Sequence, residues 1–181
     1  MSRNAHVVIL CEDRQHEVFA RRFLARVGRH LRVQRVEIGP RGRGAGEQFV
    51  RDRFAKELAY YRARKHRVEQ ALIVLIDADG IDVAARIEQV ESACLETEDE
   101  RRQANERVAI FVPARNIETW LAYLEGQTVN EDDTYPHLKR ERDCQRHVDA
   151  LYDMCQQQTL RRPSPPSLEA ACAEYRLRLQ L

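Results

Sequence analysis

No apolar run in this 181-residue chain approaches the roughly 20 residues that a membrane-spanning helix needs. The N-terminus carries an apolar stretch of only a few residues before Glu12, which is too short for a signal peptide. Both absences predict a cytoplasmic protein with no membrane partner. The length is sufficient for one domain with a real hydrophobic core, extended by a small appendage.

The cysteines are few, odd in number and spread along the chain, and no CxxC pair occurs among the five. A secreted disulfide framework is therefore not expected, and we predict reduced thiols. A zinc site is also disfavoured. Cys144 and His147 are spaced to share a helix face, but His137 and Cys155 are too loosely spaced to complete a set of ligands. We expect structural roles for these four side chains.

Several nucleotide-binding motifs are missing as well. No GK[ST] sequence follows the glycine-rich segment, which excludes a Walker A loop, and no GxGxxG follows the first expected strand. Any dependence on ATP must therefore come from a partner. A base-reading motif is also absent, so we expect weak sequence preference if the protein binds nucleic acid.

The near-neutral net charge of +1 hides a strong division along the chain. Residues 1–70 hold 17 basic and 8 acidic residues, a net of +9, whereas residues 71–135 hold 5 and 15, a net of −10. This division indicates a polyanion-binding part beside a carboxylate-rich part. Arginine supplies 27 of the 30 basic residues, and the paired N–H donors of its guanidinium group suit phosphate oxygens. A GC-rich genome would give the same bias toward arginine.

Short apolar segments alternate with helical patterns along the chain. The most apolar segment, 71–76, is typical of a central strand buried on both faces, and 31–38 alternates like a strand near an edge. This order predicts an α/β fold with a doubly wound, mostly parallel sheet of about four strands. We expect an α/β domain over 1–125 and a helical C-terminal extension over 126–181 packed on it. The expected strands are 6–11, 31–38, 71–76 and 107–112, and the expected helices are 13–28, 47–67, 82–95, 116–124, 137–158 and 168–179.

Acidic side chains follow three of these strands. Glu12 follows the first, Asp77 and Asp79 follow the most apolar one, and Glu118 comes shortly after the last. Open α/β sheets bind ligands outside the carboxyl ends of their strands. Carboxylates gathered there repel one another unless a cation neutralises them, and ligands that are all oxygen favour Mg²⁺ or Mn²⁺ over zinc. Beside a basic surface, such a metal suggests phosphoryl chemistry.

Several polar residues near these strand ends also have a structural explanation. Asp13, next to Glu12, is expected to cap the following helix, and Asn116 is a good cap for the helix over 116–124. Glu118 lies in the first turn of that helix, where a carboxylate interacts favourably with the dipole. Asp77 and Asp79 would form a turn before a helix, although this explanation is weaker because Asp77 directly ends an apolar strand.

A strand ending at Glu12, followed by a helix and later by a central strand ending in Asp77-x-Asp79, resembles the Toprim domain. Type IA topoisomerases, bacterial primases, OLD-family nucleases and small ribosomal RNA maturases share that domain. The resemblance spans roughly residues 5–125. It implies that Glu12, Asp77 and Asp79 bind divalent metal for phosphodiester chemistry, with Glu12 also acting as a general acid or base. Glu17 and Glu118 would then be auxiliary metal ligands or lie just behind them.

The chain departs from the family pattern after its first glutamate. The family usually has glycine next and an acidic residue four positions after the glutamate, whereas here Asp13 is next and His16 is fourth. Either Glu17 takes over the second acidic role or that role is lost. This departure motivates an alternative, a non-catalytic Toprim-like subunit that docks on an ATPase or on nucleic acid.

The segment 113–121 (PARNIETWL) resembles small stand-alone Toprim-like proteins of bacterial phage-defence operons, some of which act beside a separately encoded ATPase. That likeness implies a metal-dependent nuclease in anti-phage defence, with such an ATPase as a partner. A topoisomerase is not implied, because 181 residues cannot also hold a tyrosine-bearing domain. The oligomeric state, including a homo-oligomer, stays open.

A glycine-rich basic loop, 39–46, precedes the second expected helix. Glycines let backbone amides approach phosphate, and arginines supply the charge. We therefore expect a nucleic-acid backbone, DNA before RNA, to bind Arg41, Arg43, Arg51 and Arg115. A solvated, mobile loop is the alternative interpretation.

A phosphatase of the haloacid-dehalogenase type is a further alternative. Asp77-Ala-Asp79-Gly80-Ile81 matches the opening motif of that family, in which the first aspartate is the nucleophile and the second a general acid or base. The motif normally opens the fold, however, and here a long segment precedes it. The family also needs a lysine before an acidic pair, whereas the only downstream lysine, Lys139, follows Asp132-Asp133.

Overall fold

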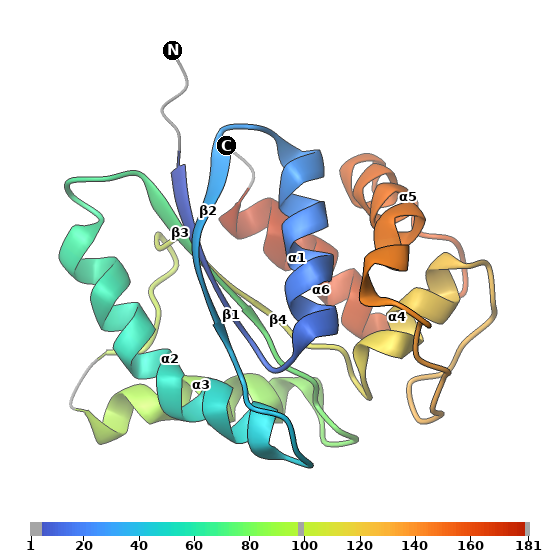
Figure 1. Ribbon diagram of the computed structural model, residues 1–181, viewed down its shortest axis with the longest axis horizontal. Coiled ribbons are helices and arrows are strands. Elements are labelled where there is room, and N and C mark those ends of the chain that lie inside the picture. Colours follow the sequence, from blue (N-terminus) through green and yellow to red (C-terminus); the bar gives the residue numbers. More distant parts are fainter. Residues whose placement is uncertain (1–4, 98–99, 180–181) are drawn as a thin grey trace.

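The computed structural model describes residues 5–97 and 100–179. Its centre is a four-stranded sheet in the order β2-β1-β3-β4, in which every neighbouring pair is parallel. Helices cover both faces (Figure 1). This architecture confirms the predicted α/β class and the parallel sheet. The strands are β1 (Ala5–Cys11), β2 (Leu31–Ile38), β3 (Gln70–Leu75) and β4 (Val108–Phe111).

The helices follow the strands in the predicted alternation. Within the described ranges, none of them is both long and apolar enough to cross a membrane. Residues 98 and 99, in the acidic connection before the last strand, lie outside the described residues. The helices are α1 (Arg14–Val27), α2 (Ala45–Arg64), α3 (Val83–Glu96), α4 (Ile117–Leu124), α5 (Gln145–Gln157) and α6 (Pro166–Arg178), with a 3₁₀ turn η1 (Glu141–Cys144) before α5.

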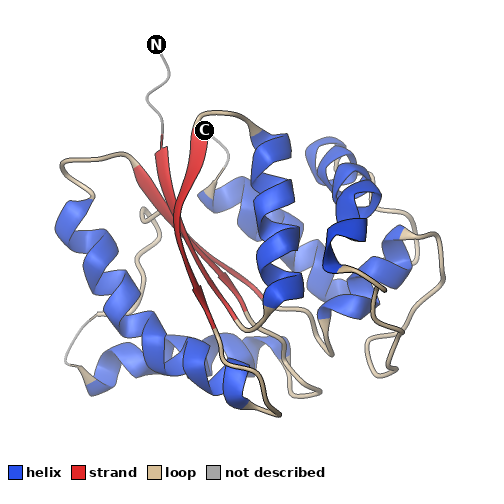
Figure 2. Cartoon of the chain, in the orientation of Figure 1, coloured by secondary structure: helices blue, strands red, loops and turns tan. Residues whose placement is uncertain are grey.

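Side chains of alternate strand residues feed two separate cores, one on each face of the sheet. Ile9 and Ile73 pack with α1, α4, α5 and α6, whereas their neighbours Leu10 and Leu72 pack with α2 and α3. Figure 2 shows the sheet between these two groups of helices. Because β1 and β3 are covered on both faces, they carry continuous apolar runs, while the edge strand β2 alternates as predicted. The C-terminal helices thus complete one face of the domain.

The prediction of reduced thiols was wrong for one pair of cysteines. Cys155 of α5 and Cys172 of α6 form a disulfide with a Cα–Cα distance of 5.2 Å. Their spacing of 17 residues gives no local signal, since the pairing depends on how the two helices pack. Cys11, Cys94 and Cys144 are buried and are not in a disulfide.

Helix starts agree with the sequence at two positions and differ at one. The Asp13 side chain accepts a hydrogen bond from the His16 backbone N–H at 2.9 Å, which confirms it as the cap of α1. Asn116 is the N-cap residue of α4, as predicted, but its side chain makes no capping hydrogen bond. The helix expected from residue 137 begins only at η1, because residues 137–140 form a loop.

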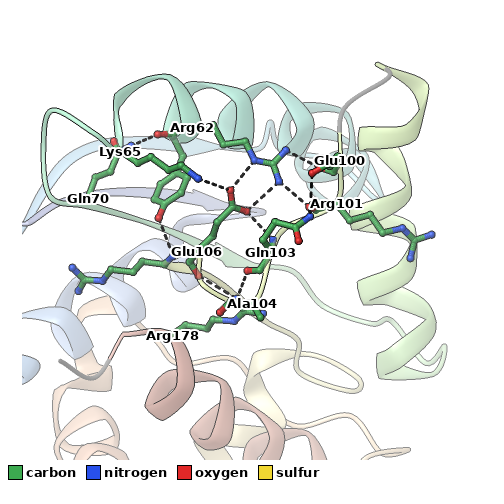
Figure 3. A network of polar contacts seen from close by, with 11 residues as sticks. Arg62, Lys65, Gln70, Glu100, Arg101, Gln103, Ala104, Glu106 and Arg178 are labelled. Atoms are coloured by element: carbon green, nitrogen blue, oxygen red, sulfur yellow. Dashed lines mark hydrogen bonds and ion pairs between the residues drawn. The ribbon is translucent and has the colours of Figure 1, made fainter.

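A polar network closes the end of the sheet where the strands begin (Figure 3). Buried Glu106, two residues before β4, accepts hydrogen bonds from Arg62 of α2 at 2.8 and 3.1 Å and from the backbone N–H of Gln103 at 2.8 Å. Arg178 of α6 donates to the carbonyls of Gln103 and Ala104 at 2.6 and 2.9 Å. Helices from opposite faces of the sheet are thereby tied to one loop, at the end of the sheet away from the predicted site.

Candidate functional site

In the sheet, β2 lies on one side of β1 and β3 lies on the other side. The strand order therefore reverses between β1 and β3. In open α/β sheets the crevice at such a reversal, outside the carboxyl ends of the strands, is where ligands bind. Glu12 follows β1 directly, and Asp77 comes two residues after β3. The backbone N–H of Asp77 donates to Glu12 Oε1 at 2.6 Å. The structure therefore brings these two predicted site residues into contact at the reversal.

His16 adds a cation to this pair. Its side chain, in the first turn of α1, is fully buried, with Nε2 3.1 Å from Asp77 Oδ1 and Nδ1 3.0 Å from Asp13 Oδ1. Burial disfavours an imidazolium, but the Asp77 charge and the hydrogen bonds to both aspartates outweigh it and raise the pKa of His16 well above its usual value. Sequence reasoning treated His16 only as a departure, although its place after Glu12 puts it on the turn that faces the site.

Ionising Glu12 and Asp77 together, at the point where the strand order reverses, costs free energy. Burial raises the pKa of Glu12, and the nearby charge of Asp77 raises it further. Burial also raises the pKa of Asp77, with His16 opposing the shift and the Glu118 charge adding to it. Repulsion in a poorly hydrated crevice keeps protons on such groups until a cation compensates them. A bound cation would offset this cost and favour the ionised carboxylates.

Asp79 stands at the exposed tip of the turn that follows β3. Its backbone φ of +53° is in the left-handed region, and its side chain is 57% exposed. The backbone N–H groups of residues 78–80 donate to the carbonyls of residues 113–115 at 2.8 to 3.3 Å. The turn is therefore fastened to the loop between β4 and α4, and it presents Asp79 beside that loop.

Arg86, a residue that sequence reasoning did not single out, supports the same turn. It extends from α3, is 5% exposed, and donates to the Ala78 carbonyl through Nη2 at 3.1 Å. The same Nη2 lies 3.9 Å from Asp79 Oδ2, and the guanidinium also bonds Glu47 at the start of α2. Burial raises the pKa of Asp79, and the Arg86 charge opposes this rise. The sequence carries no signal of this role, because the burial of Arg86 depends on how α3 packs.

Glu118 reaches the site from the third strand end. It is 5% exposed in the first turn of α4, and its Oε1 lies 2.6 Å from Nδ1 of His137. Its charge adds to the rise in the pKa of Asp77 that burial causes. Two residues earlier, Asn116 Oδ1 is buried and has no hydrogen-bond partner among the described residues. Asn116 thus offers an uncommitted oxygen next to the start of α4.

Glu17 is paired with two arginines of its own helix. It lies on α1, where Arg21 donates to it at 2.8 Å and Arg14 also bonds it. Burial alone would raise its pKa, but these arginines lower it. A role for Glu17 as an auxiliary metal ligand stays a prediction, and it would require one of these ion pairs to open.

The glycine-rich loop lies directly against Glu12. A Cβ added to Gly46 would lie 2.7 Å from the Glu12 carbonyl oxygen, and one added to Gly39 would lie 2.6 Å from the same atom. Only glycine permits this approach without displacing one of the two backbones. The tight packing places the basic loop beside the carboxylates.

The four arginines expected to bind phosphate differ in availability. Arg41 and Arg43 are exposed on the loop, and the side chains of Arg41, Arg43 and Arg115 make no hydrogen bond or ion pair to another described residue. Arg115 lies over the turn after β3, since a Cβ added to Gly80 would lie 3.0 Å from its Nη1. Arg51 is instead paired with Glu47, its Nε 2.6 Å from Oε1. Three uncommitted guanidinium groups therefore flank the carboxylates.

The donor chemistry fits a hard divalent cation. In the described part of the chain, no three histidine, cysteine or acidic side chains are already arranged as a metal-binding group. Glu12, Asp77, Asp79 and Glu118 nevertheless supply only oxygen donors, and burial, with repulsion from neighbouring carboxylates added, raises the pKa of Glu12 and Asp77. Oxygen ligands select Mg²⁺ or Mn²⁺. The side chains weighed for zinc have other partners: His137 bonds Glu118, His147 Nε2 lies 2.9 Å from Glu125 Oε1, and Cys155 is in the disulfide.

Comparison of the chain with protein-family models, with curated proteins and with solved structures gave no significant match.

Proposed function

We propose that the protein is a Mg²⁺- or Mn²⁺-dependent nuclease of the Toprim type that cleaves phosphodiester bonds in DNA or, less favoured, RNA. The observation that carries the proposal is the direct contact between Glu12 and the Asp77 backbone where the strand order reverses. Two carboxyls with raised pKa meet there, and uncommitted arginines flank them. This combination suits a metal ion and a polyanion together.

Each residue of the site has a role in this proposal. Glu12, Asp77 and Asp79 would hold the metal, which when bound polarises the phosphate and activates water. Arg41, Arg43 and Arg115 would bind the phosphates on either side of the scissile bond. Glu12 would hold or release a proton at its carboxyl, consistent with its raised pKa. His16 would hold the Asp77 carboxylate in place.

The biological setting is proposed on the resemblance of segment 113–121 alone. We infer that the nuclease acts in the cytoplasm in anti-phage defence, together with a separately encoded ATPase. Support for the partner is indirect: the sequence holds no Walker A loop of its own.

The test is cleavage of plasmid and single-stranded DNA by purified protein in Mg²⁺, Mn²⁺ or EDTA. Asp77→Asn should reduce the metal-dependent rate at least about 100-fold, because the replacement removes a charge from the metal site. Asp132→Asn, a matched change on an exposed loop, should cut at the wild-type rate. Cleavage that persists in EDTA, or in Asp77→Asn, would refute the proposal.

A non-catalytic subunit is a second candidate, and the position of His16 favours it. The imidazolium already supplies a positive charge 3.1 Å from Asp77 Oδ1, in place of the expected carboxylate. Under this candidate, Mn²⁺ binding would be weak, no cutting would occur with any partner, and Asp77→Asn would still assemble with the ATPase. A generic phosphomonoester assay would detect the phosphatase alternative.

A further inference from the structure

Two histidine–glutamate pairs lie along one face of α4. Glu118 stands in its first turn and Glu125 at its C-terminal end. His137 Nδ1 lies 2.6 Å from Glu118 Oε1, and His147 Nε2 lies 2.9 Å from Glu125 Oε1. A separation of seven residues is about two helical turns, so both glutamates point to the same side. The segment after α4 is thus held against the helix at two points.

A cavity of about 590 Å³ lies between these two points. It is bounded by α4, by the loop before η1 and by the start of α5, and it lies within the size range of small-molecule sites, roughly 300–1,000 Å³. Its lining combines polar groups with apolar groups of α4 and the loop, the latter being Leu121, Ala122, Pro136 and Leu138. A mixed lining of this kind fits a ligand with one flat, weakly polar part and one charged part.

The charges around the cavity favour an anion. Glu125 is already paired with Arg146 at 3.0 Å and with His147. Asp143 is paired with Arg140 at 3.1 Å. Lys139, by contrast, lines the cavity, is exposed and makes no hydrogen bond or ion pair to another described residue. The acidic groups that line the cavity are therefore paired with basic side chains, whereas the Lys139 ammonium group has no such partner among the described residues.

The cavity also adjoins the carboxylate site. His137 lines it and at the same time contacts Glu118, whose charge acts on Asp77. The His137 side chain is 83% exposed, so its ring is accessible to a stacking partner, as is the neighbouring Pro136. Histidine is among the side chains on which unstacked bases pack.

We propose that this cavity holds one unpaired nucleotide of the substrate, with its base against Pro136 and His137 and its phosphate at Lys139. A nucleotide must leave a duplex stack to enter such a site, so the substrate class is single-stranded nucleic acid. The inference rests on the proposed nuclease function, because it takes the nucleotide to be part of the substrate. Nucleotide binding can nevertheless be measured without cleavage.

The first experiment is a binding titration of the full chain with thymidine monophosphate in EDTA, followed by NMR, beside inorganic phosphate. Lys139→Ala should weaken nucleotide binding about tenfold, because a charge-assisted contact is lost. The matched control is Arg142→Ala, on an exposed residue of η1 that does not line the cavity. It should leave binding unchanged. Equal affinities of the two variants, no nucleotide binding by the wild type, or phosphate binding as tightly as the nucleotide would each overturn the proposal.

The second experiment compares cleavage of single-stranded and duplex oligonucleotides of one sequence in Mg²⁺. The single strand should be cut at least about tenfold faster, and Lys139→Ala should lower that preference while Arg142→Ala keeps it. Nucleotide binding that depends on Lys139, without cleavage of any substrate, would support the cavity and count against the nuclease. Cutting of both substrates at one rate, unchanged in Lys139→Ala, would support the nuclease and overturn the cavity proposal.

Discussion

His16 Nε2 lies 3.1 Å from Asp77 Oδ1, although the two residues are 61 positions apart in the sequence. The contact joins the first turn of α1 to a residue two positions after β3, across the point where the strand order reverses. It places a buried positive charge among carboxyls whose pKa is raised by burial and mutual repulsion. The chain therefore carries part of the neutralising charge that a metal would otherwise supply alone.

Removing the His16 side chain should make the stability of the folded protein depend more on an added cation. His16→Ala leaves Asp77 buried without its partner, which we expect to lower the free energy of unfolding by about 2–3 kcal/mol. Thermal unfolding with Mg²⁺ and with EDTA checks this: Mg²⁺ should raise the midpoint more in the variant than in the wild type. The exposed His66→Ala is the control. A His16→Ala variant as stable as the wild type in EDTA would contradict the expectation.

Arg86 should matter for both stability and the proposed cleavage. Arg86→Ala removes a nearly buried guanidinium that holds the Ala78 carbonyl and Glu47, so we expect a loss of about 3 kcal/mol and slower cutting because the turn bearing Asp79 loosens. Denaturant unfolding and the plasmid assay measure the two effects. Arg162→Ala, in an ion pair whose arginine is 78% exposed, should change stability by no more than about 0.5 kcal/mol. Equal losses of stability in Arg86→Ala and Arg162→Ala would show that Arg86 does not support the turn that bears Asp79.

The Glu106 network should make stability depend on acid pH. Burial alone would raise the pKa of Glu106, but Arg62 and the Gln103 backbone N–H outweigh it and lower that pKa in the folded state. The stabilisation is therefore complete above the ordinary unfolded value of about 4.3 and is lost as the pH falls through the lowered folded value. Glu106→Gln should cost about 3 kcal/mol at neutral pH. The difference from the wild type in urea unfolding should shrink below about pH 4; a constant difference would contradict this assignment.

The disulfide between α5 and α6 should stabilise the C-terminal part of the domain. Closing a loop of 17 residues contributes about 3 kcal/mol in the chain-entropy description. A reducing agent should therefore lower the denaturant midpoint of the wild type and leave the midpoint of a Cys155→Ser/Cys172→Ser double variant unchanged. Thiol titration of the unfolded, unreduced protein should find three thiols, those of Cys11, Cys94 and Cys144. Five thiols would show that the bond does not form.

Much of the fold follows from local patterns. The run over 71–76 predicted a buried central strand, and β3 is covered on both faces; the alternation over 31–38 predicted the edge strand β2. Asp13 caps α1 as expected, because capping involves residues only three positions apart. Asn116 also occupies the N-cap position of α4 as expected, but its Oδ1 is buried without a hydrogen-bond partner among the described residues, and no capping bond forms.

Residue spacing and chain direction are local properties, so the alternation of strands and helices follows from the sequence, as do the places of Glu12, Asp77 and Asp79 after their strands. Which side chains meet depends on the tertiary structure: Glu12 with the Asp77 backbone, His16 with Asp77, and Cys155 with Cys172. The tertiary structure also pairs Glu17 with Arg21 and Arg51 with Glu47. Contacts between distant segments depend on helix packing and strand order, which no single stretch of sequence records.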